Sequence, residues 1–145
     1  MLYFDDISVG STFQSSSRTI LDADIVNFAG LSGDFNRLHV DDVFAATTPF
    51  KRRIAHGMLV ASVVTGLKSK MDDMAVLAFL ETSRKFRKPV FPGDTVTANF
   101  AVAEMRPSKS RPDTGVIVFS VRVANQQGET VQEGQDIIMF ERRAS

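Results

Sequence analysis

The spacing of apolar and polar positions separates a helical first half of the chain from a strand-rich second half. Apolar side chains recur at i, i+3 and i+4 from Ile25. This spacing predicts an amphipathic helix with Asp22 as its N-cap and an end near Gly30 or Gly33. A short helix is predicted over residues 41–46, where acidic residues of the first turn suit the helix dipole.

The segment 57–70 is the strongest helix prediction, because it is apolar nearly all round. Such helices are usually buried. After Met74 the period changes to two and predicts strands from 76 to about 90, over 95–105, 115–124 and 130–140, the last two joined as a hairpin. Residues 12–20 are predicted as an extended edge strand. We therefore predict an α+β fold, an antiparallel sheet wrapped around a long central helix, as one domain over residues 1–145.

Composition narrows the classes of function. Seventeen basic residues balance seventeen acidic ones among 145 residues, so no net field attracts nucleic acid or an anionic membrane. No cysteine is present, which excludes disulfides, thiol catalysis and thiolate metal sites. No signal peptide and no run of about 20 apolar residues is visible. We expect a cytoplasmic protein without nucleic-acid or membrane partners.

Two features carry candidate chemistry. Asp34 and His39 lie five residues apart in a loop opened by Gly33. A carboxylate and an imidazole at this distance can share a water and move protons near neutral pH, although such a pair more often caps a loop and fills a core. Gly57 opens the apolar helix, where its free N–H can hold developing negative charge; taken alone, this glycine is better explained by a close turn into the helix.

Other residues are more ambiguous. His56 is interpreted as structural, bonding the loop around Arg53. Two histidines without metal-ligand spacing argue against a metal site, and no serine-hydrolase or nucleotide-binding motif occurs. A basic cluster contains Arg84 and Lys85, and it either binds ligand phosphates or is the charged edge of a strand.

The segments that contain these residues resemble MaoC-like (R)-specific enoyl-CoA hydratases. Residues 28–39 are similar to the hydratase-2 motif, and the resemblance continues through 44–50, 54–59 and 86–94. It implies a hot-dog fold, a homodimer or higher homo-oligomer, and hydration of a trans-2-enoyl-CoA to an (R)-3-hydroxyacyl-CoA. No metal or redox cofactor is implied, since coenzyme A is part of the substrate; acyl carrier protein is an alternative carrier.

The resemblance also assigns roles to residues. Asp34 and His39 become the water-activating dyad, and the Gly57 N–H becomes the donor to the thioester carbonyl. Substrate-binding roles are expected for Asn36, Arg37, Met58, Thr65, Arg84 and Lys85. Arg37 stands where the family usually has proline. It either points to solvent or lines the pocket, and in the second case a carboxylated acyl group is expected.

Two alternatives remain at this point. A hot-dog acyl-CoA thioesterase could use the same carboxylate, water and helix-start N–H. A catalytically silent module that binds acyl thioesters would need the pocket but not the dyad. Release of free thiol distinguishes the first from a hydratase, and binding without turnover distinguishes the second.

Overall fold

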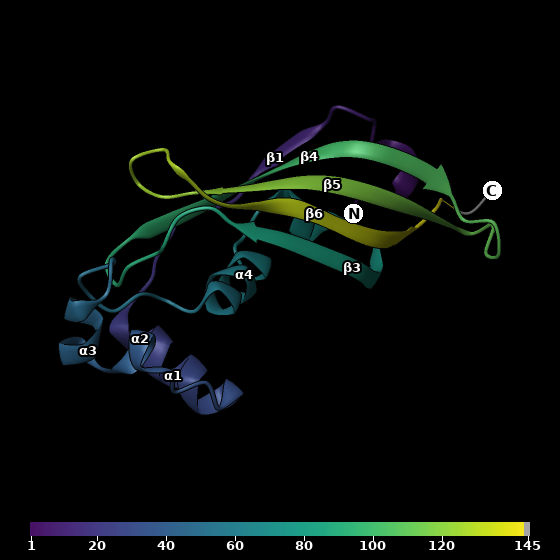
Figure 1. The fold of residues 1–145 in the computed structure, drawn as a ribbon. Helices are drawn as coiled ribbons and strands as arrows, with labels where there is room; N and C mark the ends of the chain where they lie inside the picture. Colours follow the sequence, from purple (N-terminus) through teal and green to yellow (C-terminus); the bar gives the residue numbers. More distant parts are fainter. Residues whose placement is uncertain (144–145) are drawn as a thin grey trace.

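A six-stranded antiparallel sheet forms one layer of the molecule in the computed structural model, which describes residues 1–143. The strand order is β1-β4-β5-β6-β3, with β2 also paired to β4 (Figure 1). The bounds are β1 (Thr12–Gln14), β2 (Arg18–Thr19), β3 (Val76–Phe86), β4 (Thr95–Pro107), β5 (Thr114–Ala124) and β6 (Thr130–Glu141). The strands predicted after residue 74 and the β5–β6 hairpin are thus confirmed, except that β3 ends at Phe86.

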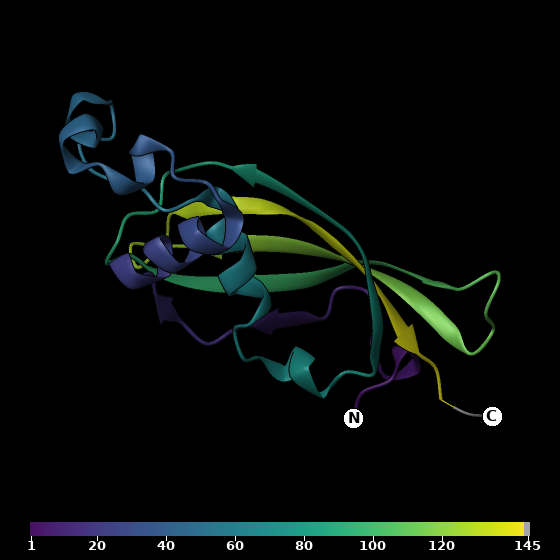
Figure 2. The same ribbon diagram turned by 90° about the horizontal axis from the view of Figure 1, so that it is seen from below.

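Helices lie on one side of this sheet. They are α1 (Asp22–Ser32), α2 (Arg37–Val40), α3 (Asp42–Thr47) and α4 (Gly57–Thr65), with short 3-10 turns η1 (Phe4–Asp6) and η2 (Lys70–Asp73). Figures 1 and 2 show α1–α4 gathered toward the end of the sheet where β5 turns into β6, while the C-terminus lies at the other end. No helix in residues 1–143 is long and apolar enough to cross a membrane.

The core lies between α4 and the concave face of the sheet. Apolar side chains of α4 are buried there: Leu59, Val60, Ala61, Val63 and Val64. The predicted inner face of β4 is buried as well: Val96, Ala98, Phe100 and Val102. Each large aliphatic side chain removed from water contributes about 1.5–3 kcal/mol. This burial fixes α4, and therefore its first residue, Gly57, against the sheet.

The central helix is shorter than predicted. It ends at Thr65 instead of continuing to Lys70, because Gly66 is a poor helix former and closes the last turn with its N–H on Val63 and Val64 carbonyls. Ser69 then starts η2 by accepting from the N–H of Met71. A new capped turn therefore competes with continuation of the helix.

Two predictions for the N-terminal part were also wrong in detail. The stretch 12–20 is not one strand, because Ser15 bonds both the N–H and the carbonyl of Ala98 and separates β1 from β2. The N-cap of α1 is Leu21 rather than Asp22, and Asp24 accepts from the Leu21 N–H at 2.8 Å. Both changes leave the course of the chain as predicted.

The edge strand β3 is unusually apolar for an exposed element. Val76, Leu77, Phe79 and Leu80 are each more than two-fifths exposed, and one side of β3 has no partner strand among residues 1–143. Edge strands of monomeric proteins are normally short or charged. This edge is therefore a candidate contact surface.

Candidate active site

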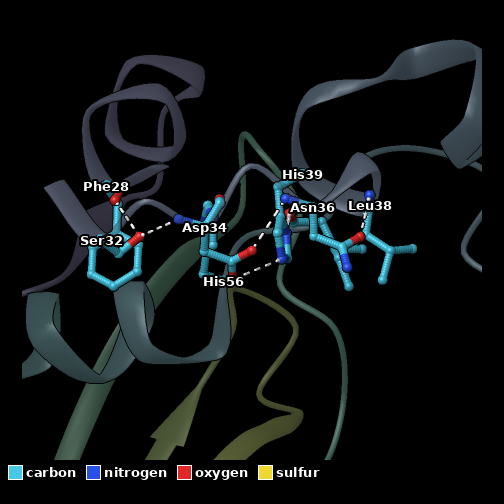
Figure 3. Close-up of polar contacts among 8 residues, drawn as sticks. Phe28, Ser32, Asp34, Asn36, Leu38, His39 and His56 are labelled. Atoms are coloured by element: carbon cyan, nitrogen blue, oxygen red, sulfur yellow. Dashed lines mark hydrogen bonds and ion pairs between the residues drawn. The ribbon is translucent and has the colours of Figure 1, made fainter. Parts of the chain in front are cut away.

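Asp34 is placed by the end of α1. Gly33 adopts a left-handed conformation with φ of 78° and closes the helix by donating its N–H to the Ala29 carbonyl. The Asp34 N–H then bonds Ser32 Oγ at 3.2 Å, and one carboxylate oxygen, Oδ1, accepts from the Asn36 N–H at 3.1 Å. The second oxygen is left to face His39 (Figure 3).

His39 lies on the short helix α2 and is held by one strong hydrogen bond. Its Nδ1 is 2.7 Å from the Ile54 carbonyl oxygen, so Nδ1 carries the proton and donates. In the neutral ring Nε2 is then a free acceptor, 4.0 Å from Asp34 Oδ2. The His39 side chain is 11% exposed and that of Asp34 53%, so the pair stands at the boundary between core and solvent.

His56 supports both members of this pair. Its ring stacks on that of His39 with centroids 3.8 Å apart and lies 5.0 Å from the Phe28 ring. Its Nε2 donates to the Asp34 carbonyl oxygen at 2.9 Å. The side chain is structural, as predicted, but its bond goes to Asp34 and not to the loop around Arg53. It therefore fixes the backbone of the candidate catalytic carboxylate.

The same three residues are the one group in residues 1–143 with metal-ligand composition, with ligand atoms of Asp34, His39 and His56 within 4.8 Å of one another. His39 Nδ1 and His56 Nε2 are already bonded to carbonyls. The rings are inclined by only 25°, so their in-plane lone pairs run side by side instead of converging as a tetrahedral site requires. We assign no metal to this cluster.

Gly57 is the first residue of α4, and its N–H has no acceptor among residues 1–143. A Cβ at this position would lie 2.7 Å from the Phe86 ring, so the close approach of the ring requires glycine. The Gly57 carbonyl accepts from Gln132 Nε2 at 2.8 Å. The residue thus presents a free N–H at the positive end of a buried helix.

One pocket of about 650 Å³ joins these parts. Asp34, His39 and Gly57 all line it, as does Met58, the one predicted substrate-binding residue found there. The remaining walls are largely apolar and include Phe28, Phe50, Ile54, Phe86 and Val90. Such a pocket suits a hydrocarbon chain with its reactive end held at a few polar groups.

Two predicted substrate-binding residues, Asn36 and Thr65, bond backbone groups at helix ends. The Asn36 side chain caps α2 by accepting from the Leu38 N–H at 3.0 Å. Thr65 Oγ1 donates to the Ser62 carbonyl at 2.6 Å, at the far end of α4 from Gly57. Neither residue lines the pocket. The polar side chains of both residues are explained by their hydrogen bonds to backbone groups at helix ends.

Arg37 points away from the pocket. Its guanidinium pairs with Asp41 at 2.9 Å, lies 4.4 Å from the centre of the Phe44 ring, and is 63% exposed. The Phe44 N–H, and then Arg37, hold the pKa of Asp41 below its ordinary value. The structure thus favours the solvent-facing interpretation of Arg37 and gives no support for a contact of this residue with an acyl group in the pocket.

The basic cluster is divided by the alternation of β3. Arg84 is turned inward, where its side chain and that of Asp136 are 5% and 4% exposed and pair at 2.7 Å. Lys85 is exposed and lies away from the pocket. The following residues Arg87 and Lys88 do line the pocket, each paired with a glutamate, Glu133 and Glu129. The structure gives no support for phosphate binding by Arg84.

The sequence interpretation did not foresee the contacts of Arg53, and it missed Gln132 as a pocket residue. Arg53 pairs with Asp22 at 2.8 Å and Asp42 at 2.6 Å, and these contacts, Asp42 first, raise its pKa. It thereby ties α1 to α3 behind the dyad. Gln132 is 2% exposed and lines the pocket. The sequence feature that could have identified Gln132 is its place next to Val131, in a strand where apolar and polar residues otherwise alternate.

The chain is similar to a known domain family and to named enzymes. The family model described as MaoC like domain matches residues 7–124. An (R)-specific enoyl-CoA hydratase of Rhodospirillum rubrum is 38% identical over 97% of this chain and 93% of its own length. One of Aeromonas caviae is 39% identical over 80% and 83%.

A solved structure from Mycobacterium tuberculosis described as a double hotdog fold superposes with a TM-score of 0.84 at 22% identity, covering 99% of this chain and 45% of the other. At this identity the likeness concerns the fold alone. The predicted hot-dog architecture is confirmed.

Proposed function

The chain belongs to the MaoC-like domain family, and we propose that it hydrates a trans-2-enoyl-CoA reversibly to an (R)-3-hydroxyacyl-CoA. One observation carries the proposal: Asp34, His39 and the free Gly57 N–H line a single, mostly apolar pocket. Relatives named (R)-specific enoyl-CoA hydratase support the reaction and its stereochemistry.

The proposed chemistry starts from a water held between Asp34 Oδ2 and His39 Nε2. These atoms are 4.0 Å apart, too far for a direct bond and close enough for both to contact one water. His39 Nε2 takes a proton as the water oxygen bonds to C3. The C2–C3 π electrons move toward the thioester oxygen as an enolate, and the imidazolium returns the proton to C2. The Asp34 carboxylate orients the water and stabilises the imidazolium.

The Gly57 N–H is proposed to hold the thioester oxygen. Negative charge grows on this oxygen as the enolate forms, so a fixed donor at a helix start is stronger in the transition state than in the ground state. Because the same dyad delivers the water oxygen to C3 and the proton to C2, both add to the same face of the double bond. The step needs no metal or redox cofactor.

We also propose that the protein is a homodimer joined through β3. The exposed apolar residues 76–80 and the unpaired side of this strand are what a second copy of the chain would cover. Acyl carrier protein stays an alternative carrier to coenzyme A, and the cytoplasmic location stays a prediction.

The decisive test is hydration of crotonyl-CoA, followed as loss of the enoyl-thioester absorbance, with chiral analysis of the product. Asp34→Asn and His39→Ala are expected to lower kcat by a factor of about 100 or more, within the range for general acid–base groups. Asp73→Asn, an exposed carboxylate on η2, is the matched control and should behave as wild type.

Other outcomes would exclude the proposal. Release of free thiol from acyl-CoA by the wild type, without hydration, would show a thioesterase. Binding of acyl-CoA without turnover would show a silent module. Full activity of both dyad variants, with their fold intact by circular dichroism, would refute the assigned mechanism.

A further inference from the structure

Gly57 is contacted from two sides by two residues that lie directly opposite each other in the sheet. Phe86 on β3 pairs in register with Gln132 on β6. The Phe86 ring covers the Gly57 Cα, where a Cβ would be 2.7 Å away. Gln132 Nε2 donates to the Gly57 carbonyl at 2.8 Å. The Gly57 Cα and the peptide group that follows it are thus restrained by the sheet.

Such restraint matters because glycine is the least restricted residue in the chain. The peptide that carries the Gly57 N–H is fixed relative to α4, because its carbonyl, that of His56, accepts from the Val60 N–H at 3.2 Å. An electrostatic donor accelerates a reaction only when its position is also set beforehand. The position of this first turn relative to the pocket depends on the contacts that β3 and β6 make with Gly57.

The bond from Gln132 is kept at a cost in stability. Its side chain is 2% exposed, and Oε1 has no hydrogen-bond partner among residues 1–143. The Gly57 carbonyl lies in the first turn of α4, where it accepts a helical hydrogen bond even without Gln132. An aliphatic side chain at position 132 would therefore leave no buried polar atom unpaired there. Buried unpaired groups of this kind are rare and call for a functional reason.

The local strand geometry also serves this bond. The β5–β6 pairing shifts between Val123/Gln132 and Ala124/Thr130, so that Val131 is an extra residue in β6. Val131 and Gln132 are both buried as a result, and the Val131 carbonyl accepts from the N–H groups of Arg87 and Lys88. Bulges next to active sites commonly re-aim a side chain in this way.

We infer that Gln132 is a positioning residue, which holds the first turn of α4 through the Gly57 carbonyl so that the Gly57 N–H meets the thioester oxygen. This inference rests on the proposed hydratase function. It assigns Gln132 no contact with the reacting atoms. Its effect is therefore on kcat, through the strength of the bond to the enolate oxygen, with little effect on binding of the ground state.

The test compares Gln132→Met, which keeps the length but cannot donate, with Gln135→Met on the same strand, an exposed residue outside the pocket. With crotonyl-CoA, Gln132→Met is expected to lower kcat about tenfold and to leave KM within about twofold, the size of one hydrogen bond. Gln135→Met should match the wild type.

A spectroscopic reading separates positioning from a general loss of structure. Crotonyl-CoA labelled with ¹³C at the thioester carbonyl is bound to the Asp34→Asn variant, which is expected to turn it over about 100-fold or more slowly, and the spectrum is recorded before turnover. The shift of the carbonyl stretch to lower frequency should be smaller when Gln132→Met is added. Infrared spectra of the bound label report only on folded protein, so a lowered Tm does not remove the information.

The outcomes are distinct. A wild type that hydrates crotonyl-CoA, together with a Gln132→Met variant equal to Gln135→Met in kcat and in carbonyl frequency, overturns the inference and leaves the proposed function intact. A wild type that hydrates no enoyl-CoA overturns both. A rise in KM with unchanged kcat also overturns it, because Gln132 would then act in ground-state binding.

Discussion

The imidazole rings of His39 and His56 stack with centroids 3.8 Å apart and planes inclined by 25°. Each ring also bonds a backbone carbonyl, His39 that of Ile54 and His56 that of Asp34. One histidine therefore presents its free nitrogen to the pocket, while the other holds both the first ring and the carboxylate opposite it. The proposed dyad is therefore supported by a third side chain, that of His56.

His56→Phe should separate these two supports. The ring stack is kept, but the donor to the Asp34 carbonyl is lost, which costs about one hydrogen bond or roughly tenfold in kcat. His56→Ala removes both supports and should lower kcat further. Steady-state hydration of crotonyl-CoA measures both variants, and equal kcat for wild type and His56→Phe would show that Asp34 needs no such anchor.

Gly57→Ala should damage the site more than the fold. The new methyl group would meet the Phe86 ring at 2.7 Å, and this ring is half exposed and can swing away from α4. We expect a small change in Tm and a fall in kcat of tenfold or more, at least the size of one lost oxyanion hydrogen bond. Adding Phe86→Leu should recover part of the kcat; no recovery would show that the ring is not the obstacle.

Arg84→Met should destabilise the protein, because it leaves Asp136 buried without its partner. Breaking a buried ion pair from one side costs about 3–5 kcal/mol, which corresponds to a Tm lower by about 10 °C in a domain of this size. Differential scanning calorimetry gives the comparison. The neighbouring Lys85→Met, at an exposed position, should leave Tm nearly unchanged; equal effects of the two variants would contradict the assignment.

Phe79→Lys should separate the proposed dimer. Phe79 is 52% exposed on the free strand β3, and a lysine there places a charge where two edges would meet. Light scattering should give twice the chain mass of 16.0 kDa for the wild type and one chain for the variant. Val43→Lys, an equally apolar but separate position on α3, should stay dimeric. A monomeric wild type would refute the dimer.

Much of the fold follows from local pattern. The period of two in β4, β5 and β6 and the apolar run after Gly57 depend only on near neighbours in the sequence, and each was found where predicted. The end of α4 was not, because Gly66 and the capping of η2 by Ser69 compete with a helical continuation that is equally apolar. The spacing of apolar residues does not show that Gly66 ends one helix and Ser69 begins another.

The site was predictable where its residues are adjacent in the chain. Asp34 follows α1, His39 lies on α2 and Gly57 begins α4; all three line one pocket, and the resemblance of motif already grouped them. The partners of Arg84 and Gln132 depend instead on the register between β3 and β6 and on a bulge at Val131. A basic cluster in the sequence therefore became one buried ion pair and several surface pairs.

The strand β3 has two roles that the register of the sheet makes inseparable. One side of it is the free edge proposed to meet a second copy of the chain, and its last residue, Phe86, covers Gly57. A slip of β3 along β6 by one residue would turn Phe86 to the opposite face. Under the proposed assembly, the subunit contact that holds β3 in register also holds Phe86 against Gly57, the proposed oxyanion donor. Both the dimer contact and the geometry of the proposed site then depend on β3.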